Sequence, residues 1–268
     1  MYKKTESFTD HSKPYITGNG YASYCKHVFN YEGYEKNPNI NNNWIYIKTD
    51  YISTYFNSCE VPDNCVIFTS NSDYRITNKH LQYLNNNKVK YWFGQNAAIT
   101  HHKLKSIPIG LANSVWSHGT RERLDIITSI QNTKKETMLY VNFAVATNRE
   151  ERNKCLELTG TTNSYGPMTP VENINNVSKS FFCLSPDGGG GDAHRTWEAL
   201  YLGCIPIVTK QEVMTHYENL PIIVLNDWKE FKTLNLNESL YNSIWNNFDR
   251  SKLYLDNYIQ NIKKTYNI

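Results

Sequence analysis

Several features that define other protein classes are missing from this sequence. No apolar run reaches the roughly 18 residues of a membrane span, so no transmembrane helix is expected. The opening residues MYKKTESFTDHSK lack the apolar segment of a secretory signal. The six cysteines form no Cys-x-x-Cys pair and are interpreted as reduced residues. We therefore expect a cytoplasmic protein.

Strong charge and metal-binding patterns are missing as well. The net charge is only +3, and the lysines are spread along the chain, so no nucleic-acid partner is expected. There is no Asp-x-Asp pair and no cluster of histidines and cysteines, which predicts that no metal is bound. No Gly-Lys-Ser or Gly-Lys-Thr follows a glycine-rich stretch, which argues against a P-loop.

The composition is that of a folded globular protein. With 268 residues, 40% of them hydrophobic and 20% charged, the chain can build two modest cores. A charged break follows a helical segment near residues 130–137, and we place the boundary between two lobes there. The prediction is an N-terminal lobe of residues 1–132 and a C-terminal lobe of residues 133–268, with the last helix able to pack back on the first lobe.

Strand-like segments alternate with helix-like segments in both lobes. Residues 43–52 and 65–70 are rich in β-branched and aromatic side chains, as buried strands are. In the second lobe we expect a helix with Thr147 as its N-cap, a strand at residues 181–185 and a helix at residues 194–203. This alternation indicates an α/β fold with parallel sheets covered on both faces.

The most unusual segment is SPDGGGGDAHRTWEALYLGCIPIVTK, residues 185–210. A strand is expected before it, and a helix is expected to begin at His194. Bare backbone at the end of a parallel strand lets N–H groups approach an anion, which the helix N-terminus also attracts. Arg195 could bind phosphate oxygens through two parallel hydrogen bonds. The bare backbone comprises Gly188, Gly189, Gly190 and Gly191.

Glu198 follows Arg195 by three residues, so both lie on one face of the expected helix. A carboxylate would repel phosphate, but it can accept hydrogen bonds from both hydroxyls of a ribose. The alternative is a surface ion pair between Arg195 and Glu198, worth about 0.2–0.5 kcal/mol, beside a loose loop. A dinucleotide-binding site is a weaker alternative, because the glycines and Glu212 have roughly its spacing but lie late in the chain.

The segment FFCLSPDGGGGDAHRTWEALYLGCIPIV resembles the sugar-donor motif of exostosin-like glycosyltransferases, glycosyltransferase family 47 and its relatives. In that motif a strand and a glycine-rich loop lead into an Arg-x-x-Glu-Ala helix that ends in Gly-Cys-Ile-Pro. Other segments resemble the family in the same order: TSNSDY, YWFGQN, HHKLKSIPIGLANSVWSHG, YVNFAVATNREER and LPIIVLNDW. The resemblance spans roughly residues 65–260. We expect the chain to depart from the family in having a short N-terminal lobe and no membrane anchor.

The resemblance implies a GT-B architecture, in which two Rossmann-like lobes face each other across a cleft. The second lobe would hold a nucleotide-diphosphate sugar and the first lobe a glycan or glycolipid acceptor. The expected activity is sugar transfer to an acceptor hydroxyl, with no metal and no cofactor besides the donor. Inversion is expected, because one base in line with a departing diphosphate suffices, and retention is the alternative, because retaining enzymes share this architecture. The alternatives are a non-catalytic carbohydrate- or nucleotide-binding module of this fold and, more remotely, an NAD-dependent oxidoreductase.

Candidate site residues follow from these considerations. Asp73 and Asp50 each follow an expected strand. Asp73 is the first choice, and Asp50 the second, for the base that deprotonates the acceptor. The alternative for Asp73 is a turn residue or a helix cap before Thr77. Asn96 and His102 are candidates for contacts with the acceptor or with phosphate. On the donor side we expect the four glycines, His194, Arg195, Glu198, Asn148 and Arg152, the last of which could instead be a solvated helix residue.

Overall fold

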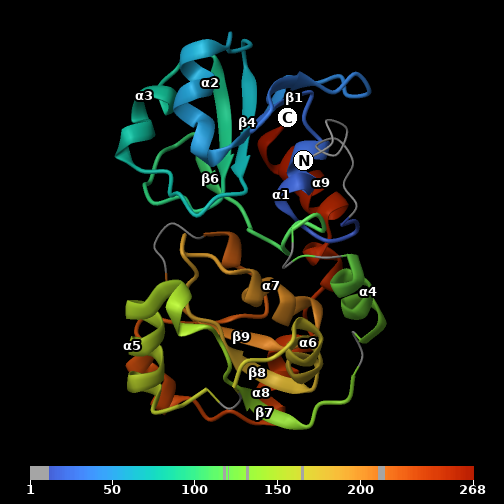
Figure 1. Cartoon of the computed structure of the whole chain (residues 1–268), viewed down its shortest axis with the longest axis vertical. Helices are drawn as coiled ribbons and strands as arrows, with labels where there is room; N and C mark the ends of the chain where they lie inside the picture. Colours follow the sequence, from blue (N-terminus) through green and yellow to red (C-terminus); the bar gives the residue numbers. More distant parts are fainter. Residues whose placement is uncertain (1–11, 117–118, 120, 131–132, 164–165, 211–214) are drawn as a thin grey trace. The chain divides into compact units, whose positions relative to one another are not determined.

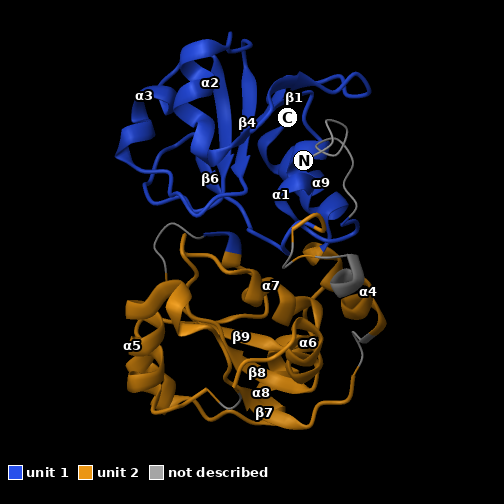
Figure 2. Cartoon of the chain, viewed as in Figure 1, with its two compact units in different colours: residues 1–113, 212–216, 254–268 blue, residues 114–211, 217–253 orange. Residues whose placement is uncertain are grey.

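A computed structural model of the chain describes residues 12–116, 119, 121–130, 133–163, 166–210 and 215–268 (Figure 1). The chain divides into two compact units (Figure 2). Unit 1 comprises Met1–Asn113, Glu212–His216 and Tyr254–Ile268, and unit 2 comprises Ser114–Gln211 and Tyr217–Leu253. The division falls before helix α4 (Arg121–Ile130) and not after it, because α4 packs against α6 (Pro170–Ser178) of unit 2.

Unit 1 is built on a six-stranded sheet with the strand order β2-β1-β3-β4-β5-β6. Five of these strands run parallel, and β2 pairs antiparallel with β1, so the sheet is mixed and not wholly parallel as expected. Gly33, with φ of 101°, opens β2 in a conformation that glycine adopts readily. The strands are β1 (His27–Asn30), β2 (Gly33–Lys36), β3 (Trp44–Lys48), β4 (Cys65–Ser70), β5 (Val89–Gly94) and β6 (Leu104–Ser106).

Helices cover both faces of this sheet, since successive strand residues point to opposite sides. Ile67 of β4 belongs to a core that includes Tyr55 of α2 (Ile52–Ser58). The ring of the next residue, Phe68, stacks on Tyr21 of α1 (Gly18–Ser23) with centroids 5.9 Å apart. The helix α9 (Leu255–Tyr266) lies beside α1 (Figure 1), and the ring centroid of its Tyr258 is 6.3 Å from that of Tyr21. Shorter elements are η2 (Thr49–Tyr51), η3 (Asn78–His80) and α3 (Leu81–Leu84).

Unit 2 is built on a four-stranded parallel sheet with the order β10-β9-β8-β7. Its core joins Phe182 of β8 and Ile207 of β9 to Cys155, Trp228 and Tyr241 of the surrounding helices. The α/β class predicted from the sequence is therefore confirmed. The elements are β7 (Thr137–Tyr140), η4 (Val145–Asn148), α5 (Arg149–Thr159), β8 (Ser180–Leu184), α7 (His194–Tyr201), β9 (Ile205–Thr209), η5 (Thr215–Tyr217), β10 (Ile223–Leu225), η6 (Trp228–Thr233), α8 (Glu238–Trp245) and η7 (Arg250–Leu253).

The start of α5 differs from the sequence prediction. The N-cap is Asn148 and not Thr147, because the 3-10 turn η4 carries the chain through Thr147 before the helix begins. The Asn148 side chain makes no capping hydrogen bond to its own helix. Its Nδ2 donates instead to the carbonyl oxygen of Gly188, 3.0 Å away. The residue before α5 is thus tied to the glycine-rich loop.

Lys135 connects the ends of two helices in unit 2. Its Nζ donates to the carbonyl oxygens of Ser178, the last residue of α6, at 2.8 Å, and of Leu202, the C-cap of α7, at 3.0 Å. Burial lowers the pKa of Lys135 to about 8, from 10.5. The folded protein therefore releases this proton at lower pH than the unfolded chain does.

This difference predicts a pH-dependent effect of Lys135→Met on stability. Between about pH 8 and pH 10.5 the unfolded chain keeps the proton that the folded wild type has lost, so wild-type stability gains as the pH rises through this window. The free energy of unfolding of the wild type, relative to that of Lys135→Met, should rise by roughly 1–3 kcal/mol from pH 7 to pH 10. Urea unfolding of both proteins at the two pH values measures the change, and an unchanged difference would contradict the prediction.

Candidate functional site

The glycine-rich loop joins the carboxyl end of β8 to the N-terminus of α7. The Ser185 Oγ lies 2.8 Å from the Thr196 Oγ1, which ties the start of the loop to the first turn of the helix. Within the loop the Gly188 N–H donates to the Gly191 carbonyl oxygen at 3.2 Å, so this N–H is used internally. Gly191 has φ of 120°, and of the four glycines only Gly189 is exposed. The loop is thus an ordered turn, which excludes the alternative of a loose segment.

Asp192 anchors the end of this loop. Its side chain is only 2% exposed and accepts hydrogen bonds from the Trp197 Nε1 at 3.0 Å and the Tyr217 hydroxyl at 2.6 Å. Loss of water around the hydroxyl raises the pKa of Tyr217, and the Asp192 carboxylate raises it further. Tyr217 therefore stays protonated and remains a donor at neutral pH. No local pattern in the sequence signals this anchor, because only the fold brings Tyr217 to the loop.

Two guanidinium groups lie over one aromatic ring beside the loop. The Arg195 Cζ is 5.6 Å and the Arg152 Cζ 5.8 Å from the centroid of Phe143, which follows β7. Arg195 also donates from Nη1 to the carbonyl oxygen of Asn142. Burial lowers the pKa of Arg152 to about 10, and the nearby positive charge of Arg195 adds to the lowering, whereas the charge of Asp187 opposes it. The structure thus holds two like charges close together at the carboxyl end of the sheet.

Arg152 and Asn148 position the loop backbone. The Arg152 Nε donates to the Asp187 carbonyl oxygen at 3.1 Å and its Nη1 to the Ala144 carbonyl oxygen at 2.6 Å. Asn148 holds the next carbonyl, that of Gly188. Because Arg152 is only 5% exposed, it is not the solvated helix residue that the sequence left as an alternative. Asn148 and Arg152, which were predicted to contact the donor, therefore bond to the backbone of the loop and fix its shape.

The remaining residues predicted for the donor side belong to α7. Trp197 and Leu200 are buried, and Glu198 is also only 6% exposed. This burial excludes a solvent-exposed ion pair between Arg195 and Glu198. His194, at the first position of the helix, is partly exposed, and its ring centroid lies 6.4 Å from that of Trp116. The Glu212 of the alternative dinucleotide site lies outside the described residues.

Three of the residues predicted for the acceptor side follow neighbouring parallel strands of unit 1. Asp50 follows β3, Asp73 follows β4 and Asn96 follows β5, so all three lie at the carboxyl edge of the sheet. Asp73 is exposed. Asp50 forms an ion pair with Lys48, which occupies one oxygen of its carboxylate. Thr77 supplies the capping box of η3, so Asp73 is not the cap of that turn.

His102 lies at the amino edge of this sheet, where the parallel strands begin. The loop after β5 runs back along the sheet before β6 begins at Leu104, which pairs with Trp92. The ring of His102 is 4.4 Å from that of His101, whose Nε2 lies 3.2 Å from the Oδ1 of Asn85, ahead of β5. The structure therefore does not bring His102 together with the other predicted acceptor-side residues.

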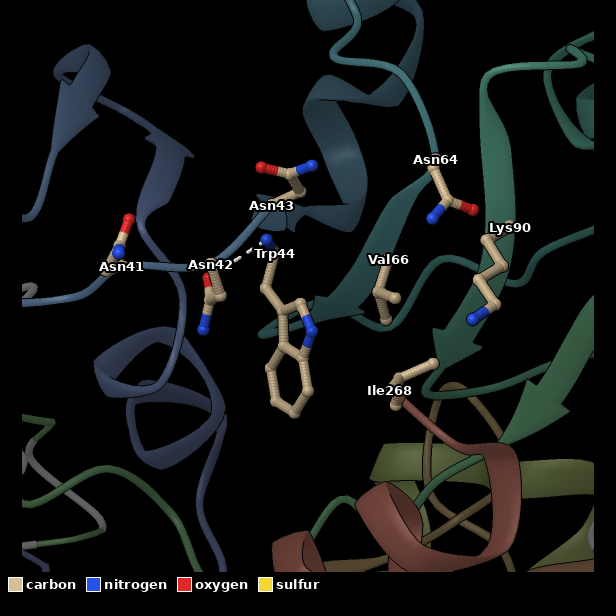
Figure 3. A pocket seen from close by; sticks show the side chains of 8 residues that line it. All are labelled: Asn41, Asn42, Asn43, Trp44, Asn64, Val66, Lys90 and Ile268. Atoms are coloured by element: carbon tan, nitrogen blue, oxygen red, sulfur yellow. Dashed lines mark hydrogen bonds between the residues drawn. The ribbon is translucent and has the colours of Figure 1, made fainter.

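A cavity of about 310 Å³ also lies at this amino edge (Figure 3). Trp44 opens β3 and Val66 lies at the start of β4, and the side chain of Ile268 approaches them in Figure 3. Asn42, another lining residue, is already engaged, because its Oδ1 accepts from the Trp44 N–H and its Nδ2 donates to the Tyr24 carbonyl oxygen. In parallel sheets ligands bind at the carboxyl ends of strands, so this cavity is not the candidate site.

A serine–histidine pair was not predicted from the sequence. The Oγ of Ser106, the last residue of β6, lies 2.6 Å from the Nδ1 of His216 in η5. Ser106 ends its strand at the same edge as Asn96. The two residues are separated by 110 positions in the chain, so no local pattern signals their contact. His216 is therefore a further titratable group at the carboxyl edge of the unit 1 sheet.

Within the described part of the chain, no three His, Cys, Asp or Glu side chains gather as metal ligands would. In the same residues, none of the helices is long and apolar enough to cross a bilayer. A scan of protein-family models finds no match to the chain, and a search of curated proteins finds none either.

Proposed function

We propose that this protein is a glycosyltransferase that transfers a sugar from a nucleotide-diphosphate donor to a hydroxyl group of a glycan or glycolipid. The observation that carries the proposal is the pair of guanidinium groups, Arg152 and Arg195, over Phe143 beside the glycine-rich loop. Two adjacent positive charges repel each other, and a bound diphosphate offsets that repulsion. The resemblance of the same segment to the donor motif of exostosin-like enzymes supports the assignment.

The donor in this proposal is held by unit 2. Arg195 and the N-terminus of α7 stabilise the diphosphate, and Arg152 keeps the loop in place and adds positive charge. Glu198, which is only 6% exposed, is the residue proposed to accept hydrogen bonds from the ribose hydroxyls. The fixed cations take the place of a metal ion, as the lack of an Asp-x-Asp pair in the sequence also suggests.

The acceptor in this proposal is held by unit 1, as the first lobe of a GT-B enzyme holds the acceptor and the second lobe the donor. The acceptor oxygen attacks the anomeric carbon as the bond from that carbon to the diphosphate oxygen breaks, and the hydroxyl proton passes to Asp73. A single in-line displacement inverts the configuration at the anomeric carbon. Asp73 is preferred to Asp50 because its carboxylate is exposed, whereas that of Asp50 is paired with Lys48.

A non-catalytic nucleotide- or sugar-binding module is the second candidate function. The observation that favours it is the ion pair between Asp50 and Lys48, which leaves one of the two predicted acids to act as a base. Such a module would keep the donor site and show no turnover. Nucleotide binding and catalysis therefore have to be tested separately.

Nucleotide binding is tested by Arg195→Met. Removing a guanidinium that binds the diphosphate should weaken the affinity for UDP or GDP by about 10- to 100-fold in isothermal titration calorimetry. Arg250→Met is the matched control, since its Cζ also lies over an aromatic ring, 5.5 Å from Trp245, and its Nη2 donates to the Tyr201 carbonyl oxygen. Arg250 lies near the other end of α7, so its substitution should leave the affinity unchanged. The proposal fails if the wild type binds neither nucleotide or if both variants bind like the wild type.

A further inference from the structure

Five carboxamide side chains gather in unit 1 at the carboxyl edge of its sheet: Asn19, Asn71, Gln95, Asn96 and Asn113. We call them the carboxamide cluster. Three of them form a closed ring of hydrogen bonds. The Asn71 Nδ2 donates to the Asn19 Oδ1 at 3.0 Å, and the Asn113 Nδ2 donates to the Asn71 Oδ1 at 2.9 Å. The backbone N–H of Asn19 donates to the Asn113 Oδ1 at 2.9 Å and closes the ring.

The other two members fix the loop that follows β4. The Gln95 Nε2 and the Asn96 Nδ2 both donate to the carbonyl oxygen of Ser72, each at 3.1 Å. The Gln95 Oε1 accepts from the backbone N–H of Asn71 at 3.1 Å. These bonds set the orientation of the amide groups without any ligand. A site whose polar groups are already oriented loses little conformational entropy when a ligand binds.

The backbone around the cluster is shaped to bring the amides together. Asn71 has φ of 60° and Asn96 φ of 55°, so both adopt the left-handed conformation that is unfavourable for most residues. Gly18 allows α1 to approach Asn71 closely, because a Cβ at this position would lie 1.7 Å from the Asn71 Oδ1. Asparagine tolerates the left-handed conformation better than most residues, so these two turns can bring Asn71 and Asn96 into the cluster.

One acceptor in the cluster has no hydrogen bond. Among the described residues, the Oδ1 of Asn96 has no partner, although the side chain is only 1% exposed. Buried acceptors are nearly always paired, and leaving one unpaired is unfavourable. The oxygen itself is buried, so a ligand hydroxyl group approaches the cluster through Asn19 and Asn71, its two partly exposed members. Carboxamides both donate and accept, which matches the hydroxyl groups of a neutral sugar.

The loop beside the cluster offers an aromatic ring. Tyr74 is 67% exposed and follows Asn71 by three residues, in the loop that also contains Asp73. An exposed tyrosine ring provides an apolar face for the C–H groups of a sugar and a hydroxyl that faces water. The two charged residues of the loop, Asp73 and Arg75, have opposite signs, and the cluster itself is uncharged. The chemistry therefore favours a neutral ligand over an anionic one.

We propose that unit 1 binds a neutral sugar through the carboxamide cluster, with the ring of Tyr74 packed against one face of that sugar. The identity of this sugar as the acceptor rests on the proposed function, because Asp73 is the candidate base in the same loop. The binding itself does not depend on that function.

The test is saturation-transfer NMR on the full chain without nucleotide. The probes are three neutral disaccharides (lactose, cellobiose and chitobiose) and one anionic chondroitin disaccharide. At least one neutral probe should bind, and the anionic probe should bind more weakly. Tyr74→Ala should lower the affinity for the probe that binds by about tenfold, whereas Tyr74→Phe keeps the ring and should retain the affinity. Asn19→Ala should also lower this affinity about tenfold. Asn57 is an exposed asparagine of α2, so Asn57→Ala should leave the affinity unchanged.

The outcomes separate this inference from the proposed function. Tyr74 is exposed, so Tyr74→Ala should fold normally and reports on binding even if Asn19→Ala does not fold. The inference is overturned if no neutral probe binds, if the anionic probe binds best, or if Tyr74→Ala binds like the wild type. If neutral sugar binds but UDP and GDP do not, the proposed function fails and the sugar site remains.

Discussion

Asp73→Asn is expected to lower the turnover of sugar transfer by about 10²–10⁴-fold, while the affinity for UDP or GDP stays at the wild-type value. The acceptor hydroxyl must lose its proton as it attacks, and an amide cannot take that proton. Asp73 is exposed and lies in unit 1, whereas the predicted nucleotide contacts lie in unit 2. The substitution should therefore change kcat and not nucleotide binding.

The measurement is nucleotide release with mixed neutral acceptors, using a donor identified by thermal shift with a panel of nucleotide sugars. Asp50→Asn is the control, because its carboxylate is paired with Lys48 and a smaller effect is expected. If Asp73→Asn keeps full turnover while His216→Asn loses it, the base is the histidine that contacts Ser106. If the wild type binds nucleotide and never turns over, the protein is a binding module.

Gly110→Ala is expected to have the largest effect on stability, a loss of about 3 kcal/mol or more in the free energy of unfolding. Gly110 has φ of 66°, where an L side chain is strained. A Cβ at this position would also lie 2.1 Å from the carbonyl oxygen of Ile16. That oxygen accepts the N–H of Leu111 at 2.8 Å, so it cannot move away without breaking this hydrogen bond.

Gly160→Ala separates the two contributions. Gly160 ends α5 with φ of 71°, close to that of Gly110, but a Cβ there meets no atom within 4 Å. Its substitution should therefore cost only the backbone strain, about 1–2 kcal/mol. Both changes are measured by urea unfolding relative to the wild type. Equal losses in the two variants would show that contact with Ile16 contributes nothing.

The local elements of this fold were predictable because their signals are local. The segment 65–70 was predicted as a strand and is β4, and a helix was predicted from His194, where α7 begins. Runs of β-branched and aromatic residues are buried wherever a sheet has two covered faces. The hairpin of β1 and β2 was not predicted, because no residue of β2 is buried and the polar Glu35 and Lys36 give no strand signal.

The structure differs most from the predicted site where side chains contact groups that are distant in the sequence. Asn148 and Arg152 were predicted to contact the donor, but their partners are the carbonyl oxygens of Gly188 and Asp187, 40 and 35 positions away. His102 was placed with Asn96 by sequence proximity, although the return of the chain before β6 puts it at the opposite edge. Residue type predicts which chemistry is possible, and the path of the backbone decides which groups meet.

By itself the sequence determined the α/β class, the main strands and the glycine-rich turn before α7, because each depends on side chains that are neighbours in the chain. Only the tertiary structure decided that Arg152 and Arg195 share the ring of Phe143, and that five carboxamides from separated segments form one cluster. The physical reason is that burial and hydrogen bonding act between groups that are close in space, and these distances exist only once the sheets have formed.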